Sequence, residues 1–245
     1  MPTPTDPKDL ALISRMAADR ELRELSRQFV VRGAAYRYSY NFSWLGISII
    51  QHPEDLVAMQ EIIWRVRPDA IVETGVAHGG SLVFYASMLE LLGGDGFVVG
   101  IDIDIRAHNR ALIEKHPTAA RIHLVQASSI DPQTIRKVTT LVKGRKRVLV
   151  ALDSNHTHAH VLQELRLYSP LVRKGSYLVV FDTVVEHMPV EMFEERPWAP
   201  GDSPMTAVRQ FLSENHRFEV DPEYDGKLLI TVAPEGYLSC IEDPI

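Results

Sequence analysis

Cysteine is almost absent from this sequence. The chain of 245 residues contains one, Cys240, so no intrachain disulfide can form and a secreted fold built on disulfides is excluded. Long apolar runs are missing too, because none approaches the roughly 18 residues needed to cross a bilayer. Residues 1–6 lack the basic and apolar stretches of a signal peptide. These absences lead us to expect a cytoplasmic protein without a membrane partner.

The sequence also lacks the basic stripe that proteins binding nucleic acids usually carry. The net charge is −6, and acidic and basic residues are interspersed. The only dense basic run covers residues 143–147, which we interpret as a solvated connection between a helix and a strand. No linker of glycine, serine or proline divides the middle of the chain. We therefore expect one large α/β domain and no nucleic-acid partner.

Residues 1–66 are predicted to form an N-terminal extension of helices and aromatic residues, followed by a domain over residues 67–245. Apolar residues recur at helical spacing between residues 7 and 33, which predicts one helix there. The stretch 36–46 is aromatic, polar and interrupted by glycine, and Pro53 then opens another helix. Because this extension exceeds a minimal α/β core, we expect it to take part in a homo-oligomer.

From residue 70 onward, short apolar segments alternate with segments of helical pattern. The apolar segments do not alternate internally, as expected for strands of a parallel sheet that helices cover on both faces. The predicted strands are 70–74, 97–103, 122–126, 148–152 and 177–181, and the predicted helices are 81–92, 106–115, 131–142, 159–171 and 206–214. Two later strands, 218–220 and 228–232, are expected to pair through a reversal at Gly226. The order predicts a doubly wound, mostly parallel, seven-stranded α/β sheet of Rossmann-like type.

The segment 184–204 is long for a connection and contains four prolines. It follows the fifth strand, at the edge where open α/β sheets bind ligands. Segments of this kind are typically lids, binding loops or disordered. We predict a lid, with a purely structural connection as the alternative.

The first strand leads into a turn in which Glu73 precedes Gly75, and Gly79 and Ser81 follow. Glycine lets the backbone approach a ligand closely. The spacing matches neither the G-x-G-x-x-G pattern of dinucleotide sites nor a P-loop. A carboxylate before the first glycine would repel a pyrophosphate but suits the cationic amine and sulfonium of S-adenosylmethionine (SAM). SAM is therefore the predicted cofactor, and a plain strand-to-helix turn is the alternative.

The ends of the second and third strands supply further candidates for cofactor binding. A carboxylate at the tip of the second strand accepts hydrogen bonds from ribose hydroxyls in folds of this type. Asp102 is the predicted ribose ligand, with Asp104 as the second choice. Ser128 and Ser129, after the third strand, are expected to meet the adenine; alternatively, they cap the helix that follows.

Two aspartates follow the fourth and fifth strands. Asp153 and Asp182 lie at the tips of adjacent parallel strands, so we expect their carboxylates to converge beside the cofactor. Two close carboxylates raise each other's pKa unless a cation lies between them, and Mg²⁺ prefers such oxygen ligands. An ion there would lower the pKa of an acceptor hydroxyl and align it with the methyl group. His156 is then placed to act as the general base. Zinc bound by His156, His158 and His160, or exposed and capping histidines, are the alternatives.

Six segments together form a recognisable pattern: Asn41-Phe42-Ser43-Trp44-Leu45-Gly46, Gln51-His52-Pro53-Glu54-Asp55-Leu56, Val72-Glu73-Thr74-Gly75, Gly100-Ile101-Asp102-Ile103-Asp104, Asp153-Ser154-Asn155-His156 and Gly175-Ser176-Tyr177-Leu178-Val179-Val180. In this pattern the sequence resembles the cephalosporin hydroxylase and rhamnosyl O-methyltransferase family, and looks related to the macrolide-sugar O-methyltransferases. The resemblance covers about residues 40–232. It implies a SAM-binding methyltransferase fold, a Mg²⁺ site with Asp153, methylation of a hydroxyl on a sugar or natural product, and His156 as the base.

The sequence departs from the family in one place that bears on the metal. Where the family often has a glutamate before an aspartate, this chain has Phe181 before Asp182. Glu186 or Glu73 would have to substitute. The alternatives are thus a metal-independent O- or N-methyltransferase that relies on His156, or a noncatalytic SAM-binding subunit. An iron-dependent oxygenase would leave Glu73 and Asp102 without a purpose.

Overall fold

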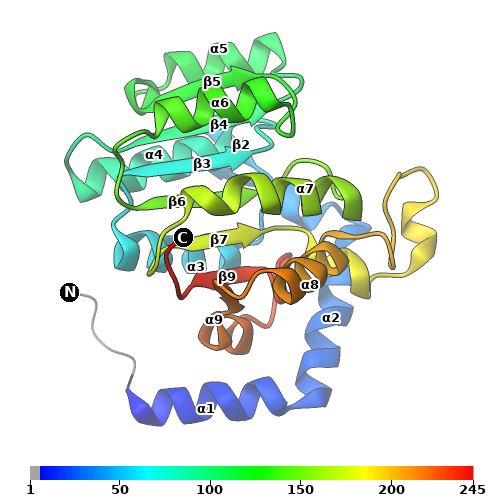
Figure 1. Cartoon of the computed structure of the whole chain (residues 1–245). Helices are drawn as coiled ribbons and strands as arrows, with labels where there is room; N and C mark the ends of the chain where they lie inside the picture. Colours follow the sequence, from blue (N-terminus) through cyan, green and yellow to red (C-terminus); the bar gives the residue numbers. More distant parts are fainter. Residues whose placement is uncertain (1–5, 245) are drawn as a thin grey trace.

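The computed structural model describes residues 6–244, and the segment 1–5, where we expected no signal peptide, lies outside the described residues. A seven-stranded sheet runs through the molecule in the order β5-β4-β3-β6-β7-β9-β8 (Figure 1). The strands are β3 (Ala70–Thr74), β4 (Phe97–Asp102), β5 (Ile122–Gln126), β6 (Val148–Leu152), β7 (Tyr177–Val180), β8 (Phe218–Val220) and β9 (Tyr237–Cys240). The five strands from β3 to β7 are parallel, whereas β9 is antiparallel to β7 and β8. The predicted fold class is confirmed.

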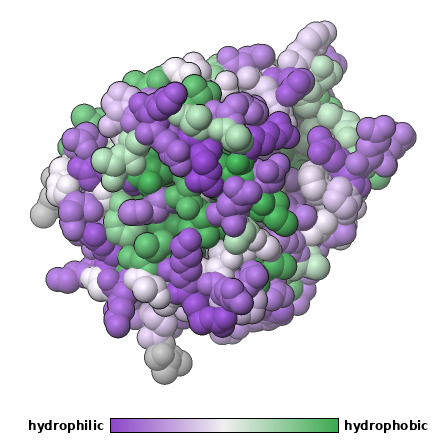
Figure 2. Space-filling model, turned by 90° about the horizontal axis from the view of Figure 1, so that it is seen from above, coloured by the Kyte–Doolittle hydropathy of each residue, from purple (hydrophilic) through white to green (hydrophobic). Residues whose placement is uncertain are grey.

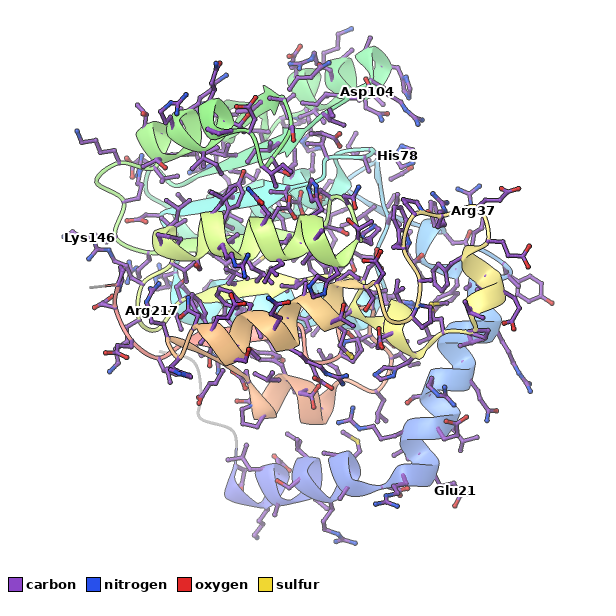
Figure 3. The ribbon with its side chains drawn as sticks, turned by 45° about the vertical axis from the view of Figure 1, so that its right-hand side comes forward. Glu21, Arg37, His78, Asp104, Lys146 and Arg217 are labelled. Carbon is purple, nitrogen blue, oxygen red and sulfur yellow. The ribbon has the colours of Figure 1, made fainter. Side chains whose placement is uncertain are left out.

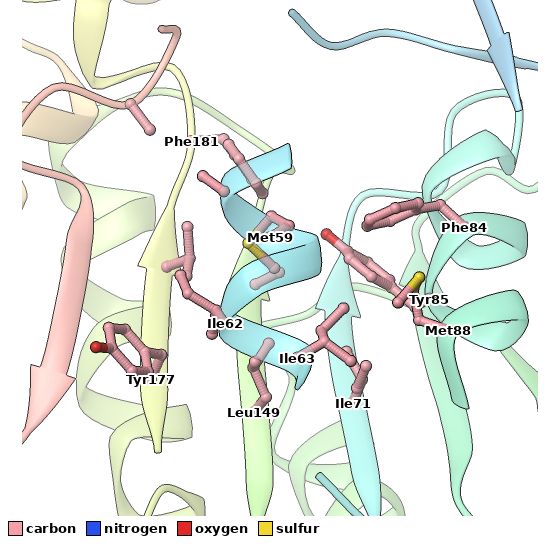
Figure 4. Close-up of a cluster of buried hydrophobic side chains, with 14 of the residues drawn as sticks. Met59, Ile62, Ile63, Ile71, Phe84, Tyr85, Met88, Leu149, Tyr177 and Phe181 are labelled. Atoms are coloured by element: carbon pink, nitrogen blue, oxygen red, sulfur yellow. The ribbon is translucent and has the colours of Figure 1, made fainter. Parts of the chain in front are cut away.

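Helices cover both faces of this sheet, so its central strands are buried on both sides. Side chains of α3 (Pro53–Val66), α4 (Gly80–Leu92) and α5 (Ala107–Lys115) pack on one face. Side chains of α6 (Pro132–Leu141), α7 (His158–Tyr168) and α8 (Pro204–Glu214) pack on the other. Figure 4 shows the first of these layers, in which Met59 and Ile63 of α3 lie against Ile71 of β3 and Leu149 of β6. Because α3 lies in this core, the segment before residue 67 is not all peripheral; the predicted domain boundary stays a prediction.

The late part of the chain differs from our expectation. Residues 228–232 form no strand, and the second late strand is β9, which pairs with β8 in the register Phe218↔Cys240. Between them, α9 (Pro222–Lys227) begins at Asp221, whose side chain accepts hydrogen bonds from Glu223 N and Tyr224 N. The predicted reversal at Gly226 is therefore wrong, because an acidic N-cap followed by proline starts a helix. The apolar character of residues 228–232 reflects burial in a loop.

The N-terminal segment forms two helices rather than one. α1 (Pro7–Ala18) ends at Asp19, whose backbone leaves the helical region and whose side chain accepts a hydrogen bond from Leu22 N to begin α2 (Arg20–Ala34). An aspartate favours such a cap, which the helical spacing of the apolar residues did not reveal. α1 packs against α9, where a Cβ on Gly226 would lie 3.0 Å from Ile13.

A β-hairpin follows in the aromatic stretch, after the 3₁₀ turn η1 (Tyr38–Tyr40). β1 (Phe42–Trp44) and β2 (Ile47–Ile49) are antiparallel and pair Phe42 with Ile49. Leu45 and Gly46 connect them with φ angles of 47° and 88°, as in the tight turns that match the twist of hairpin strands. The hairpin lies on the start of α4, since a Cβ on Gly80 would approach Ser48 O to 2.3 Å. This contact brings the N-terminal segment to the edge of the sheet where the site lies.

The surface agrees with the composition. Among residues 6–244, no helix is both long enough and apolar enough to span a membrane. The run 143–147 connects α6 to β6 and is mostly exposed, with Arg145 donating to Asp95 Oδ1 at 2.9 Å, so its interpretation as a solvated connection is confirmed. Figure 2 shows a group of apolar residues among charged ones on the face at the top of Figure 1, where α5, β5 and α6 lie.

Candidate functional site

A pocket of about 430 Å³ lies at the carboxyl ends of the parallel strands. This is the edge where open α/β sheets bind ligands. Figure 3 shows His78 and Asp104 at this end of the sheet and Lys146 and Arg217 at the other. The pocket is lined by the predicted residues Gly75, Gly79, Ser81, Asp102, Ser128, Ser129, Asp153, His156 and Asp182, but not by Glu73. Its size suits a small-molecule ligand.

The turn after β3 is held closely against neighbouring backbone. Gly75 has a φ of 90°, and a Cβ there would lie 2.0 Å from Asp153 O, so no other residue fits without moving the exit of β6. The amides of Val76 and Ala77 donate to Asp102 Oδ2 at 2.8 and 3.3 Å. A pyrophosphate would need such amides, and here a carboxylate already occupies them. The turn is therefore unsuited to a dinucleotide.

Glu73 lies behind this turn. It is 1% exposed, and Ser81 Oγ donates to its Oε2 at 2.6 Å. Burial, opposed by hydrogen bonds from Ser81 and Tyr85, raises the pKa of Glu73 to about 8. Ser81 reaches the pocket wall but Glu73 does not, so its contact with the cofactor's cationic groups stays a prediction.

Asp102, at the end of β4, lines the pocket, whereas the second choice Asp104 is exposed and does not. Asp102 Oδ1 also accepts a hydrogen bond from the backbone N–H of Asp104 at 3.0 Å. Each carboxylate oxygen has two lone pairs, so the side chain keeps acceptor capacity for ligand hydroxyls. The carboxylate is thus fixed by backbone amides at the position predicted for ribose recognition.

The serines after β5 line the same pocket. Asp131 is the N-cap of α6 and accepts from Gln133 N at 2.7 Å. The alternative that the side chains of Ser128 and Ser129 cap this helix is therefore wrong. Ser129 Oγ instead lies 3.1 Å from His160 Nε2.

Asp153, His156 and Asp182 form a cluster at the exits of β6 and β7. One ligand atom from each lies within 4.8 Å of the others, and His156 Nε2 is 3.2 Å from Asp182 Oδ2. Burial and the neighbouring carboxylate of Asp182 raise the pKa of Asp153 well above its usual range. Asp182 has a φ of 54°, a left-handed conformation that aspartate tolerates better than most residues. The predicted convergence of the two aspartates is confirmed.

The chemistry of this cluster suits a hard cation. Two carboxylates and an imidazole converge without a thiolate, and Gln51 Nε2 donates weakly to Asp153 Oδ2 at 3.4 Å. A divalent ion would relieve the repulsion between the carboxylates. The residues present therefore fit Mg²⁺.

Neither Glu73 nor Glu186, the expected substitutes for the family's glutamate, lines the pocket. Phe181 is 2% exposed and packs in the apolar layer beside α3, with its ring 6.5 Å from that of Tyr237 (Figure 4). Glu186 accepts hydrogen bonds from Gly201 N at 2.9 Å and from Ser203 Oγ at 2.6 Å, and it does not line the pocket. The site relies on Asp153 and Asp182 for its acidic oxygens.

The three histidines after β6 do not converge. His158 lies 2.9 Å from Thr206 Oγ1 through Nδ1 and 3.0 Å from Gln210 Oε1 through Nε2, away from the pocket. His160 Nε2 contacts Ser129, Ser154 and Glu164 instead. A zinc site built from these three histidines is therefore wrong.

The segment 184–204 contains most of η4 (Thr183–His187), η5 (Val190–Phe193) and a tight turn in which Ala199 and Asp202 exchange backbone hydrogen bonds. Trp198 lines the pocket, and its ring packs edge-on to His156 at 4.7 Å. Closure of this segment as a lid stays a prediction.

Sequence reasoning missed several residues that line the pocket. Ser39 belongs to the turn η1 and Ser48 to the hairpin, and Gln51 follows the hairpin. His160 belongs to α7. Gln51 lies in one of the segments that carry the family resemblance, so that segment contained a signal. Ser39 and Ser48 gave none, because only the fold of the hairpin onto α4 brings them to the pocket.

The chain is similar to known methyltransferases in both sequence and fold. The family described as "Rhamnosyl O-methyltransferase/CmcI" matches residues 36–241. A rhamnosyl O-methyltransferase of Mycobacterium bovis is 29% identical over 198 residues, which cover 80% of this chain and 77% of that relative. CmcI solved with Mg and SAM has a TM-score of 0.58 at 20% identity, over 82% of this chain and 77% of that one. MycE methyltransferase of the mycinamycin pathway, solved with Mg and S-adenosylhomocysteine (SAH), has a TM-score of 0.52 at 17% identity, over 87% and 53%. These two structures share the fold.

Proposed function

Because this chain belongs to the rhamnosyl O-methyltransferase/CmcI family, we propose that it transfers the methyl group of SAM to a hydroxyl of a sugar or small natural product. The observation that carries the proposal is the convergence of Asp153, His156 and Asp182 in the pocket that Asp102 and the glycine turn also line. A cofactor-binding wall and an acid–base cluster in one pocket are what methylation of a hydroxyl requires.

The residues of this chain have distinct roles in the proposed reaction. When bound, SAM supplies an electrophilic methyl group and Mg²⁺ lowers the pKa of an acceptor hydroxyl. Asp102 orients the cofactor through its ribose, and Asp153 and Asp182 hold the ion. His156 removes the proton of the hydroxyl as general base. A carboxylate oxygen accepts hydrogen bonds, so the proton of the neutral His156 ring belongs on Nε2, beside Asp182 Oδ2, and Nδ1 is then the basic nitrogen.

Aromatic residues in the pocket support a sugar or a flat, hydroxylated acceptor. Tyr40 of η1 and Trp198 of the segment 184–204 line the wall. Aromatic side chains combine an apolar face with a polar atom, which suits a ring that carries hydroxyls. The relative named a rhamnosyl O-methyltransferase supports the same class of acceptor.

A metal-independent reaction is the second candidate, and one contact favours it. The 3.2 Å approach of His156 Nε2 to Asp182 Oδ2 forms a histidine–carboxylate pair. Such a pair orients the imidazole and raises its basicity. In this case Asp182 positions the base rather than a metal.

The two N-terminal helices carry apolar side chains on their exposed surface. Leu12, Leu25 and Phe29 of α1 and α2 are exposed apolar side chains, and contact with a second copy would cover them. We propose a homo-oligomer that uses this segment and a cytoplasmic location.

Transfer of labelled methyl from SAM to a panel of rhamnosides and macrolide sugars tests the proposal. The assay is run with and without a chelator, with Asp153→Ala as the inactive control. Methyl transfer that stops in the chelator supports the Mg²⁺-assisted reaction. Transfer unaffected by the chelator supports the metal-independent candidate, and SAM binding without transfer to any hydroxylated acceptor contradicts both.

A further inference from the structure

One buried acidic group near the pocket takes no part in the proposed chemistry. Glu164 of α7 is 0% exposed, and its Oε2 has no hydrogen-bond partner in the described structure. Its Oε1 accepts from Ser154 Oγ at 2.7 Å and lies 3.4 Å from His160 Nε2. Leaving a carboxylate buried is costly unless a hydrogen-bond donor or a positive charge compensates it. Ser154 supplies the donor, and His160 is the group beside it that can carry a positive charge.

The surroundings of His160 determine which nitrogen carries the proton. Three oxygen atoms lie around Nε2: Ser129 Oγ at 3.1 Å, Ser154 Oγ at 3.3 Å and Glu164 Oε1 at 3.4 Å. Ser154 donates its only proton to Glu164 Oε1, so both of these oxygens act as acceptors toward the histidine. A lone pair on Nε2 would face two acceptors. In a neutral imidazole the proton consequently lies on Nε2, which leaves Nδ1 as a hydrogen-bond acceptor.

Nδ1 is the atom that a ligand would meet. His160 lines the pocket, and its side chain is 19% exposed. Nδ1 has no hydrogen-bond partner among residues 6–244, and it is not one of the fully buried unpaired atoms there. It is thus an accessible hydrogen-bond acceptor on a side chain that lines the pocket. A purely structural role for His160 would account for the contacts of Nε2 and would leave Nδ1 to solvent.

The position of His160 indicates which part of a cofactor it meets. Asp102, at the end of β4, marks the ribose position, and Asp153 with His156 marks the reactive end. The adenine ring of the cofactor must extend from the ribose away from the reactive end, toward the serines that follow the neighbouring strand β5. His160 contacts Ser129, one of these serines. An acceptor there would lie beside the edge of a bound adenine.

We propose that His160 selects adenine by accepting a hydrogen bond at Nδ1 from the 6-amino group of the base, and that Glu164 fixes the tautomer that makes this possible. The inference rests on the proposed use of SAM. A 6-oxo base presents an acceptor at the same place, so two acceptors would meet and the interaction would be lost.

Calorimetric titration with SAH and with S-inosylhomocysteine, its 6-oxo analogue, tests the proposal. The titration needs neither a methyl-acceptor substrate nor a metal ion. Wild-type protein is expected to bind SAH at least about tenfold more tightly than the 6-oxo analogue, since covering an acceptor with the ligand and leaving it unpaired costs this much or more. In His160→Ala this ratio should fall toward one. In His160→Asn, whose Oδ1 lies near the position of Nδ1, part of the ratio should remain. His158→Ala is the matched control and should keep the wild-type ratio, because His158 lies outside the pocket.

The possible results separate the inference from the proposed function. If wild-type protein binds SAH but does not discriminate against the 6-oxo analogue, or if His160→Ala keeps the ratio, the role of His160 is wrong and the function stands. If wild-type protein binds neither ligand, the use of SAM fails and the inference fails with it. Should His160→Ala not fold with Glu164 left unpaired, His160→Asn and the double variant His160→Ala/Glu164→Gln give the same ratio test.

Discussion

His156 Nε2 lies 3.2 Å from Asp182 Oδ2, although the two residues follow different strands and are separated by α7 and β7. The contact exists because β6 and β7 are adjacent and parallel, with Leu152 paired to Val180, so their exits meet at one edge of the sheet. It links the predicted base to a predicted ligand of the ion. The predictions below separate the roles of the residues in and around this pair.

Removal of the base should affect the rate and not cofactor binding. His156→Ala is expected to lower the rate of methyl transfer by about 10² to 10⁴, the usual contribution of a general base. The affinity for SAH should stay within about twofold, because His156 has no predicted role in cofactor binding. Single-turnover kinetics and calorimetry on the same preparation measure both quantities. Full activity in His156→Ala would remove the base from the mechanism, and His158→Ala serves as the control for a neighbouring histidine.

Asp153 should be required for the ion. Asp153→Ala is expected to weaken Mg²⁺ or Mn²⁺ binding by at least about a hundredfold, more than the loss of a residue that only supports a ligand. Most of the rate should be lost while SAM affinity is largely kept. Metal titration with Asp104→Ala as the control checks this, since Asp104 is exposed and outside the pocket. Equal ion affinity in wild type and Asp153→Ala would place the ion elsewhere.

Phe181→Glu tests whether the fuller acidic site of the family can be restored. The ring of Phe181 is buried in the apolar layer, so without an ion the variant should lose about 4 kcal/mol of unfolding free energy. If the new carboxylate reaches the ion, Mg²⁺ should raise the melting temperature of Phe181→Glu more than that of wild type. Phe181→Gln is the matched neutral variant. A Mg²⁺-dependent shift of equal size in the two variants would show that position 181 does not serve the metal.

Glu73 should make stability depend on pH. Burial raises its pKa from an ordinary 4.5 to about 8, so folding favours the protonated form. The stabilisation by protonated Glu73 is complete below pH 4.5 and is lost as the pH rises toward 8. Glu73→Gln stays neutral, so its unfolding free energy relative to wild type should increase by about 4 kcal/mol between pH 4 and pH 8. Denaturant unfolding of the cofactor-free proteins at both pH values checks this, and a constant difference would show that folding does not raise the pKa of Glu73.

The parallel strands could be predicted from the sequence, because each is a short run of apolar residues. Strands such as 70–74 and 148–152 are uninterrupted apolar runs, and parallel order places their ends, with Asp102, Asp153 and Asp182, at one edge. The predictions of a strand over 228–232 and of a single helix over 7–33 were wrong, because N-caps at Asp221 and Asp19 start new helices despite the apolar spacing. Both capping aspartates are visible in the sequence.

The remaining pocket residues depend on tertiary contacts. Gln51 reaches Asp153 only because the hairpin folds onto the start of α4. His160 reaches the pocket only because a helix places it toward Ser129 while turning His158 toward α8. Alternate histidines after a strand carry no local mark of which one faces a ligand. The carboxylates at the strand ends were predictable because topology alone positions them.

The central claim is that the pocket beside the Gly75 turn binds SAM and not a dinucleotide. Calorimetric titration of the purified protein with SAH, SAM and NAD tests it most directly. Saturable binding of SAH and SAM near one per chain, weakened in Asp102→Ala, with no heat from NAD, is the predicted result. Saturable NAD binding in the absence of SAM or SAH binding would contradict it.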